Sequence, residues 1–236
     1  MQATQATGLD KLSEMTEPAQ PVRNAQPGLA WCWLSGVIFA AGLGLALYQG
    51  ILDPGPALRH PATITTAYTT FALWVGAVAL MVPAKVTDWQ VQAVRLRVAR
   101  FTYILAVLAY LIHVAVAFHF AHRWQHAKAF DHVQITSGFG PGIFVSYAFT
   151  MCWAADAMWL WWNPQKYLAR RLWLLITIHL LIAFMMFQAT VAFGRGIGRV
   201  GSGVVFAVLV LAVMWRWFRR AGNVIIGLTS YPSPVP

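Results

Sequence analysis

Residues 101–132 read FTYILAVLAYLIHVAVAFHFAHRWQHAKAFDH, an apolar block that gives way to a polar, histidine-rich segment. Five of the chain's seven histidines lie between His113 and His132. The apolar part, roughly Phe101 to Ala121, is long enough for a helix to cross the hydrocarbon core of a membrane, which takes about 20 residues. The segment therefore predicts a histidine-lined helix that emerges from a membrane.

The rest of the chain has the composition of a membrane protein. It is 59% hydrophobic and 10% charged over 236 residues, whereas soluble domains carry about 25% charged residues. The apolar residues fall in long blocks, which predict an all-α, multi-pass integral membrane protein without a folded soluble domain. Six transmembrane helices are expected, at about 29–49, 63–82, 101–121, 141–162, 172–193 and 203–218. Residues 1–28 predict a disordered cytoplasmic tail, and residues 221–236 a second tail.

The positive charges favour one orientation and one set of partners. The net charge of +10 could suggest nucleic acid, but the Lys and Arg residues flank the apolar blocks instead of forming a patch, so no nucleic acid is expected. With six spans, the two tails, the loop between the second and third spans and the loop between the fourth and fifth lie on one side of the membrane. These segments hold twelve of the 17 Lys and Arg residues. The positive-inside rule therefore predicts both termini in the cytoplasm, with the histidine-rich end of the third span outside. We expect a cell membrane, in particular a bacterial inner membrane, with the lipid bilayer as partner and a second membrane protein or a homo-oligomer left open.

Three histidines follow a helical spacing that suits metal binding. His119, His122 and His126 are spaced i, i+3, i+7, so at about 100° per residue they would lie within about 60° of one another. Neutral imidazoles bind Zn, Cu, Fe and Ni, so this face could supply part of a transition-metal site. The alternative is a set of interfacial histidines that bond to water, lipid headgroups or a partner subunit. No CxxC motif accompanies them, because the two cysteines, Cys32 and Cys152, lie in separate predicted spans.

Another histidine spacing suggests haem. His113 and His126 are 13 residues apart on the third predicted span, and His179 lies on the fifth. This arrangement resembles part of the pattern of six-helix ferric reductase and cytochrome b type membrane proteins, and the resemblance implies a haem b held between histidines of two helices. The chain departs from that pattern because a second histidine on the fifth span would fall near Ala192 or Phe193, neither of which can ligate iron.

A further resemblance involves two longer segments. HFAHRWQH (119–126) and FVSYAFTMCWAADAMWLWW (144–162) are similar to a recurrent group of uncharacterised bacterial polytopic membrane proteins. This resemblance implies a six-helix membrane fold. It implies no activity and assigns no site residue.

Asp156 is the only acidic residue inside a predicted span. It would lie about 9 Å from the cytoplasmic end of the fourth span, at a depth similar to that of His179 on the fifth. An ionisable group in the bilayer is costly and usually faces a partner inside the bundle. The sequence therefore predicts a buried Asp156–His179 pair, which could relay protons, bind a cation or join the two helices.

Other patterns concern helix packing. Gly36, Ala40 and Gly44 form a small-xxx-small ridge that would let a neighbouring helix approach the first span closely. Threonines in the first half of the second span can bond to the preceding turn or to another helix, or line a substrate path. On the fifth span, one face is predicted to look into the bundle, and it consists of His179, Ala183, Met186 and Thr190.

The sequence also contains a formal GxGxxG at Gly196, Gly198 and Gly201. A dinucleotide site needs a strand before this motif and a helix after it. No strand is expected here, so we interpret the motif as a flexible turn between the last two spans.

Two functional hypotheses follow. The leading one is a metal- or haem-linked redox or respiratory accessory component of the membrane. Its ligands would come from His113, His119, His122, His126 and His179. The alternative is a non-enzymatic permease or membrane scaffold in which Asp156 and His179 line an internal polar site. The residues do not indicate a reaction.

Overall fold

The computed structural model describes residues 27–57, 59–81 and 94–229, and within them every regular element is a helix. Six helices are long and apolar enough to cross a membrane, which confirms the predicted multi-pass helical architecture. Their apolar stretches are Ala30–Leu52, Pro61–Met81, Val94–His122, Gly142–Trp162, Leu172–Ala192 and Gly196–Arg216. The predicted tail at residues 1–28 lies almost entirely outside the described residues.

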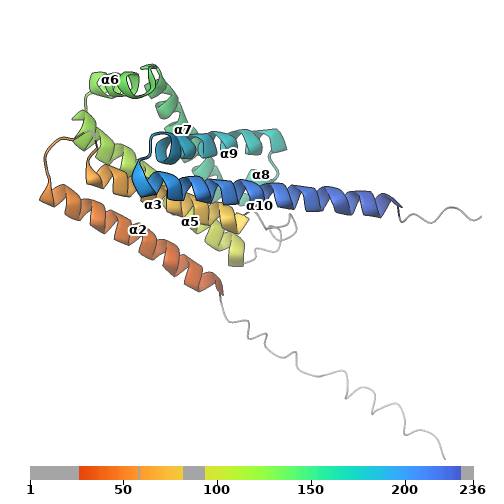
Figure 1. Ribbon diagram of the computed structural model, residues 1–236. Coiled ribbons are helices and arrows are strands. Elements are labelled where there is room, and N and C mark those ends of the chain that lie inside the picture. Colours follow the sequence, from red (N-terminus) through yellow and green to blue (C-terminus); the bar gives the residue numbers. More distant parts are fainter. Residues whose placement is uncertain (1–26, 58, 82–93, 230–236) are drawn as a thin grey trace, which may run out of the picture.

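The helices carry the labels of Figure 1. The long ones are α2 (Pro27–Leu52), α3 (Pro61–Met81), α5 (Val94–Ala117), α7 (Gly142–Trp162), α9 (Leu172–Phe187) and α10 (Gly196–Thr229). Two π-helical turns, η1 (Phe118–His122) and η2 (Gln188–Ala192), extend α5 and α9. Two short helices, α6 (His126–Ser137) and α8 (Pro164–Leu168), connect the spans on either side of α7.

The last helix is longer than the sequence predicts. It begins at Gly196 and continues to Thr229, through much of the predicted tail. The GxGxxG motif therefore forms the first turns of α10, and the prediction of a loop there was wrong. A packing requirement accounts for one of its glycines, because a Cβ on Gly198 would lie 2.1 Å from the Tyr68 hydroxyl oxygen. Gly196 has a φ of +58°, which glycine adopts without strain.

The centre of the bundle is formed by α3 and α5, which pack along each other. Helix α2 packs on both of them, α7 packs on α5, and α9 packs on α7, while α10 contacts α9 and η2 (Figure 1). Helix α6 joins the ends of α5 and α7 at one end of the bundle (Figure 1). This arrangement leaves α2 and α10 at the periphery.

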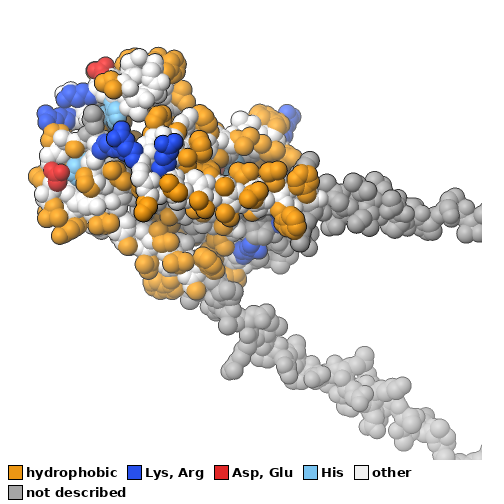
Figure 2. Space-filling view, in the orientation of Figure 1, with side chains coloured by type: hydrophobic (Ala, Val, Ile, Leu, Met, Phe, Trp, Pro, Cys, Tyr) orange, Lys and Arg blue, Asp and Glu red, His pale blue; other side chains and the backbone are white. Residues whose placement is uncertain are grey.

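The outer surface is apolar along the helices. Figure 2 shows hydrophobic side chains over most of the described bundle, with His and several Lys and Arg side chains at the end that carries α6 and further Lys and Arg side chains towards the other end. In water such a surface would be unfavourable, but against lipid tails it carries no penalty. The interior is rich in aromatic rings, and its largest fully buried side chains include Trp153, Tyr103 and Phe149.

The close contact of α2 uses a different face from the one predicted. Nothing lies within 4 Å of a Cβ built on Gly36 or Gly44, so the predicted small-residue ridge does not face a helix of the described part of the chain. The close approach is at Gly42, where a Cβ would lie 2.1 Å from the Thr69 hydroxyl oxygen of α3. On the same side, Ser35 shares a hydrogen bond of 2.8 Å with Thr102 of α5.

Candidate functional site

The histidine-rich segment is not one continuous helix. After η1, Arg123 and Trp124 adopt left-handed backbone conformations with φ of 50° and 59°, and the chain turns before α6 begins. The N–H groups of both residues donate to the Phe118 carbonyl, which closes the end of the π-turn. This corner moves the next part of the chain, including His126, onto α6.

The predicted face of His119, His122 and His126 is therefore not formed, and that prediction was wrong. His119 is exposed and meets Phe120 edge-on, whereas His122 is only 8% exposed. His126 shares a hydrogen bond of 2.9 Å between its Nδ1 and the Tyr147 hydroxyl of α7. The π-turn and the left-handed corner together separate side chains that a straight helix would have aligned.

Helix α6 brings one more histidine to η1. The His132 ring lies 5.2 Å from the His122 ring, centroid to centroid. Burial lowers the pKa of His132, because the protonated ring is poorly solvated there. This contact holds α6 against the end of α5.

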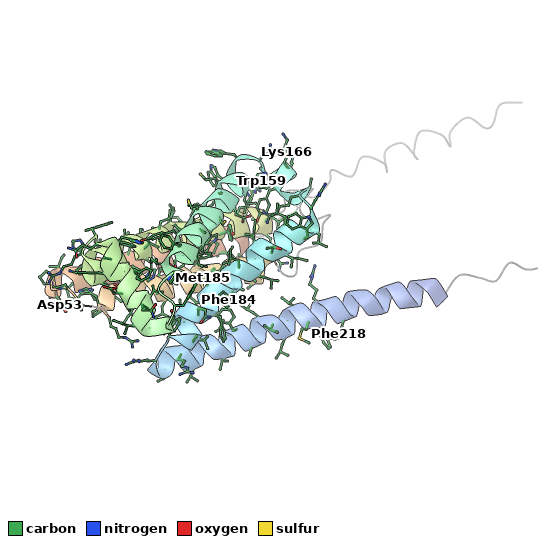
Figure 3. The ribbon with its side chains drawn as sticks, turned by 90° about the horizontal axis from the view of Figure 1, so that it is seen from above. Asp53, Trp159, Lys166, Phe184, Met185 and Phe218 are labelled. Carbon is green, nitrogen blue, oxygen red and sulfur yellow. The ribbon has the colours of Figure 1, made fainter. Side chains whose placement is uncertain are left out.

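A partly open cavity of about 230 Å³ lies between α3, α5 with η1, α7, and α9 with η2. Its polar lining consists of Thr70, Tyr110, His113, His122, Ser146, Tyr147, Thr150 and Thr190. The rest of its wall is apolar and consists of Ala67, Val114, Ala117, Phe118, Ile143, Phe149, Met185, Met186 and Ala189. In Figure 3, Met185 is seen near the middle of the bundle, between Asp53 at one end and Lys166 at the other. Among the residues that the structure describes, no Asp, Glu, Lys or Arg side chain lines the cavity.

The position of the cavity follows from which ends of the helices surround it. Its walls come from the end of α5, the beginning of α7 and the end of α9, so it lies in the half of the bundle nearer to α6. Both π-helical turns contribute to the wall, through residues such as His122 and Thr190. Such turns occur frequently at functional sites, because they re-aim side chains within a helix.

His113 is fixed by the neighbouring helix. Its Nδ1 lies 3.1 Å from the Thr63 carbonyl oxygen and 3.2 Å from the Thr66 hydroxyl oxygen, both on α3. A carbonyl oxygen can only accept, so Nδ1 carries the proton and donates it. In the neutral ring Nε2 then holds a free lone pair. Among the alternatives expected for the threonines of this span, Thr66 bonds across to another helix through this contact, and Thr66, Thr69 and Thr70 also donate to the preceding turn.

The candidate histidines are not placed so that they could together hold a metal ion or a haem. Within residues 27–57, 59–81 and 94–229, no three His, Cys, Asp or Glu side chains are grouped so that they could hold a metal ion. His113 and His122 both line the cavity, but nine residues separate them, or about 13 Å along a helix. Chelating pairs on one helix are three or four residues apart. His126 meets the cavity wall only through Tyr147, and His179 does not line the cavity, so these residues do not form a bis-histidine haem site.

A second polar site surrounds Asp156, in the half of the bundle away from α6. We call Asp156, Tyr103, Tyr167 and Arg170 the Asp156 cluster. The two tyrosine hydroxyls donate to Oδ2 of the carboxylate at 2.8 Å and 3.0 Å, and Arg170 donates to Oδ1 in an ion pair. The side chain of Asp156 is 0% exposed and that of Arg170 is 2% exposed. The cluster therefore joins α5, α7, α8 and the segment that follows α8.

Arg170 and Tyr167 are also in direct contact. The guanidinium carbon of Arg170 lies 3.8 Å from the centre of the Tyr167 ring, a distance that suits a cation–π interaction. Burial raises the pKa of the Tyr167 hydroxyl, and the negative charge of Asp156 raises it further. Tyr167 therefore keeps its proton and serves as a donor to the carboxylate.

The predicted direct pair between Asp156 and His179 is not formed. His179 shares a hydrogen bond of 3.0 Å with the Leu175 carbonyl of its own helix, and its ring stacks on Tyr103 at 6.2 Å between centroids. Tyr103 thus connects the two residues that the sequence analysis paired. The physical reason is that Arg170 supplies a charge-assisted hydrogen bond, which is stronger than a bond to neutral imidazole.

An aromatic layer separates the cavity from the Asp156 cluster. Trp153 is 0% exposed, and its ring lies 5.0 Å from that of Tyr110 on the cavity side and 6.4 Å from that of Tyr103 on the cluster side. Phe149 packs on Trp153 at 5.4 Å. The described hydrogen bonds of Tyr110 and Tyr103 lead to Thr150 and to Asp156, respectively, on opposite sides of this layer.

Sequence reasoning missed most of the polar residues of both sites. The inward face of the fifth span is confirmed at Met186 and Thr190, which are buried and line the cavity. Ser146 and Thr150, four residues apart on the fourth span, carried a usable signal, because hydroxyls on one face of an apolar helix suggest an internal surface. Arg170 gave no such signal, since it lies beyond the end of a span.

Comparison of the chain with protein-family models, with curated protein sequences and with solved structures found no match.

Proposed function

We propose that this protein binds a small uncharged molecule in its internal cavity, and that it belongs to the permease or ligand-sensing class of membrane proteins and is not an enzyme. The observation that supports this best is a cavity of about 230 Å³ in the apolar part of the bundle, whose described lining holds eight polar side chains and no Asp, Glu, Lys or Arg. A buried charge on the ligand would be left uncompensated there, which disfavours ions.

The size of the cavity limits the ligand. An apolar cavity of about 150 Å³ accommodates benzene, and pockets for drug-sized molecules are about 300–1,000 Å³. A volume of about 230 Å³ therefore suits a molecule with a single ring or a chain of similar volume. Haem is a macrocycle of four linked rings with two propionates, and it is too large for this space.

The Asp156 cluster has a supporting role in this proposal. Its carboxylate is bonded to two hydroxyls and one guanidinium, whereas Nε and Nη2 of Arg170 have no hydrogen-bond partner among the described residues. The bonds to the carboxylate tie the surrounding helices together. The cluster fixes α5 and α7, the two helices that also form much of the cavity wall. Joining helices is one of the roles predicted for Asp156 from the sequence, although the predicted partner there was His179.

The test measures ligand binding to the purified protein in lipid nanodiscs. A panel of uncharged one-ring molecules and of charged analogues is screened by thermal denaturation, because a ligand at about 100 times its Kd stabilises the folded state by about 2.7 kcal/mol. Ala67 lines the cavity on α3, so Ala67→Phe should fill it and remove the response. Ala72 is exposed on the same helix, and Ala72→Phe is the matched control that should keep the response. The proposal is excluded if only charged molecules raise the denaturation temperature of the wild-type protein. It is also excluded if the uncharged molecules shift the wild-type protein no more than they shift Ala67→Phe.

The alternative is the metal- or haem-linked redox component. One observation favours it: His113 donates Nδ1–H to a backbone carbonyl, as metal-binding histidines do, and its Nε2 is left free to ligate. An absorption spectrum and a metal analysis of the purified protein separate the two hypotheses. A Soret band or a stoichiometric metal would support the alternative and contradict the cavity proposal.

We also propose an orientation and a location. Twelve of the 17 Lys and Arg residues belong to the side that holds the termini, which supports cytoplasmic termini in a cell membrane such as a bacterial inner membrane. The cavity then lies in the outer half of the bilayer, and a ligand would enter from outside or from the outer leaflet.

A further inference from the structure

The hydrogen bonds around the cavity constrain the chemistry of its ligand, if the proposed function is right. A hydroxyl group has one proton to donate and two lone pairs to accept with. Where that proton is already bonded to a backbone carbonyl, the hydroxyl can offer only an acceptor to a ligand. The partners of each polar side chain therefore determine whether the wall donates or accepts.

Four hydroxyls of the wall donate to a backbone carbonyl of the preceding turn. Thr70 donates to Thr66 at 2.9 Å, Ser146 to Gly142 at 3.4 Å, Thr150 to Ser146 at 2.8 Å and Thr190 to Met186 at 2.8 Å. None of these four protons is left for a ligand.

The proton of Tyr110 is used as well. Its hydroxyl oxygen lies 2.9 Å from that of Thr150, whose own proton goes to the Ser146 carbonyl. Both contacts are hydrogen bonds only if Tyr110 is the donor to Thr150. Tyr110 then presents an acceptor oxygen.

The N–H proton of His113 is also already bonded to the protein. Its Nδ1–H is donated to the Thr63 carbonyl, so the nitrogen left for a ligand, Nε2, is a lone-pair acceptor. Six of the eight polar side chains therefore offer acceptors, and these are Thr70, Tyr110, His113, Ser146, Thr150 and Thr190.

The remaining wall is apolar or aromatic. Phe149 is 1% exposed, Met186 is 4% exposed, and both line the cavity together with Phe118. Aromatic faces favour an apolar ring, and thioether sulfur makes favourable contacts with ring edges.

The other two polar side chains of the wall are Tyr147, whose hydroxyl lies 2.9 Å from His126 Nδ1, and His122, whose buried Nδ1 has no partner among the described residues. An acceptor on the ligand could meet a donor only at these two residues, whereas an O–H or N–H on a ring would meet the six acceptors.

We infer that the cavity selects a neutral one-ring molecule that donates hydrogen bonds, that is, a phenol or an arylamine. A ligand of the same ring without the donor keeps the apolar contacts but leaves the acceptors of the wall unpaired. The loss of one such hydrogen bond reduces affinity about tenfold.

The probes are 4-fluorophenol and 4-fluoroanisole, which share one ring and differ by the O-methyl group that removes the donor. Both are titrated into the full-length protein in nanodiscs and followed by 19F NMR, with Ala67→Phe as the reference for partition into lipid. The expected result is that 4-fluorophenol binds the wild-type protein at least about tenfold more tightly than 4-fluoroanisole, and that neither binds Ala67→Phe.

A pair of threonine variants tests the wall itself. Thr190→Val keeps the shape of the side chain but removes an acceptor, so it should weaken 4-fluorophenol several-fold and leave 4-fluoroanisole unchanged. Thr69→Val removes a hydroxyl with the same bond to the preceding turn, to Thr65 at 2.9 Å, and Thr69 does not line the cavity. It should change neither affinity.

The outcomes separate this inference from the proposed function. If the wild-type protein binds both probes with equal affinity and Ala67→Phe binds neither, the donor requirement is overturned, but the cavity is still a binding site. Tighter binding of 4-fluoroanisole would also overturn it. If neither probe distinguishes the wild-type protein from Ala67→Phe, the inference fails, and the proposed function fails with it only if the wider panel of uncharged molecules gives no response either.

Discussion

Asp156 and Arg170 show how a charge is kept within an apolar bundle. The carboxylate receives bonds from one cation and two hydroxyls, so its two oxygens are satisfied without water. The cation is covered on one face by the Tyr167 ring. Such a pair adds little net stability, because desolvation offsets most of the attraction, but removing one partner leaves the other charge buried and alone.

Replacement of one partner should therefore be more damaging than replacement of both. Arg170→Leu is expected to lower the free energy of unfolding by about 3–5 kcal/mol, measured by denaturation in detergent. The double variant Asp156→Asn with Arg170→Leu should recover a large part of the loss, because Asn keeps an acceptor for the tyrosines and carries no charge. Arg171→Leu, at an exposed neighbouring position, is the control and should cost less than about 0.5 kcal/mol. Similar losses for Arg170→Leu and Arg171→Leu would show that the ion pair is not formed.

For single residues, the sequence predicts burial well, but it predicts hydrogen-bond partners poorly. Burial of Asp156 follows from its place in an apolar block, and the structure confirms it at 3% exposed. Its partner was missed because the depth argument compared only residues within spans. Arg170 follows α8, beyond the span, and reaches back to Asp156 after a turn that no local pattern announces.

Among the elements, the corner between η1 and α6 determines where the histidines lie. Arg123 and Trp124 both have positive φ, a conformation that costs an L-residue about 1–2 kcal/mol. The corner ends the third span and lets α6 pack against η1 and α7. Without it, His122 and His132 could not meet.

A glycine at this corner tests the backbone directly. Arg123→Gly should leave the protein equally stable or up to about 1 kcal/mol more stable, because glycine adopts φ near +50° without strain. Lys128→Gly, at an exposed position inside α6, is the matched control and should cost about 0.5–1 kcal/mol. Thermal denaturation of both variants gives the comparison. A clear loss of stability for Arg123→Gly would instead indicate the uninterrupted helix that the histidine spacing first suggested.

The spans themselves were predictable, and the corner was not. Hydrophobic length alone determines where a helix can cross a bilayer, so the first five spans were placed close to their observed positions. A left-handed corner is usually announced by Gly or Asn, and this one is formed by Arg123 and Trp124. The π-turns likewise have no sequence signal, although both contribute side chains to the cavity.

For the whole molecule, the charge distribution makes a prediction about sidedness. Reporter domains fused after Arg220 or within residues 84–100 should be cytoplasmic, and one inserted near Lys128 should be external. The histidine-rich end carries only five of the 17 Lys and Arg residues of the chain. Protease accessibility in spheroplasts provides the measurement. An external C-terminus would contradict the six-span count, and an inverted pattern at all three sites would contradict the orientation.

The overall helical class was predictable from composition, whereas the cavity was not. The class depends on the length and number of the apolar blocks, which the sequence states directly. The cavity depends on how four helices leave space between their side chains. Residues such as Ala67 and Thr150 line it only because the fold brings their helices together. Periodicity along one helix does not indicate which helices pack against it.

The aromatic layer at Trp153 has an electrical consequence. A bilayer stores a voltage that a continuous file of protonatable groups would discharge, and an indole nitrogen can donate but has no free lone pair with which to receive a proton. Trp153 and Phe149 pack between the ring of Tyr110 on the cavity side and the ring of Tyr103 on the Asp156 side, so a direct proton path between the two sites would have to cross two rings that cannot accept a proton.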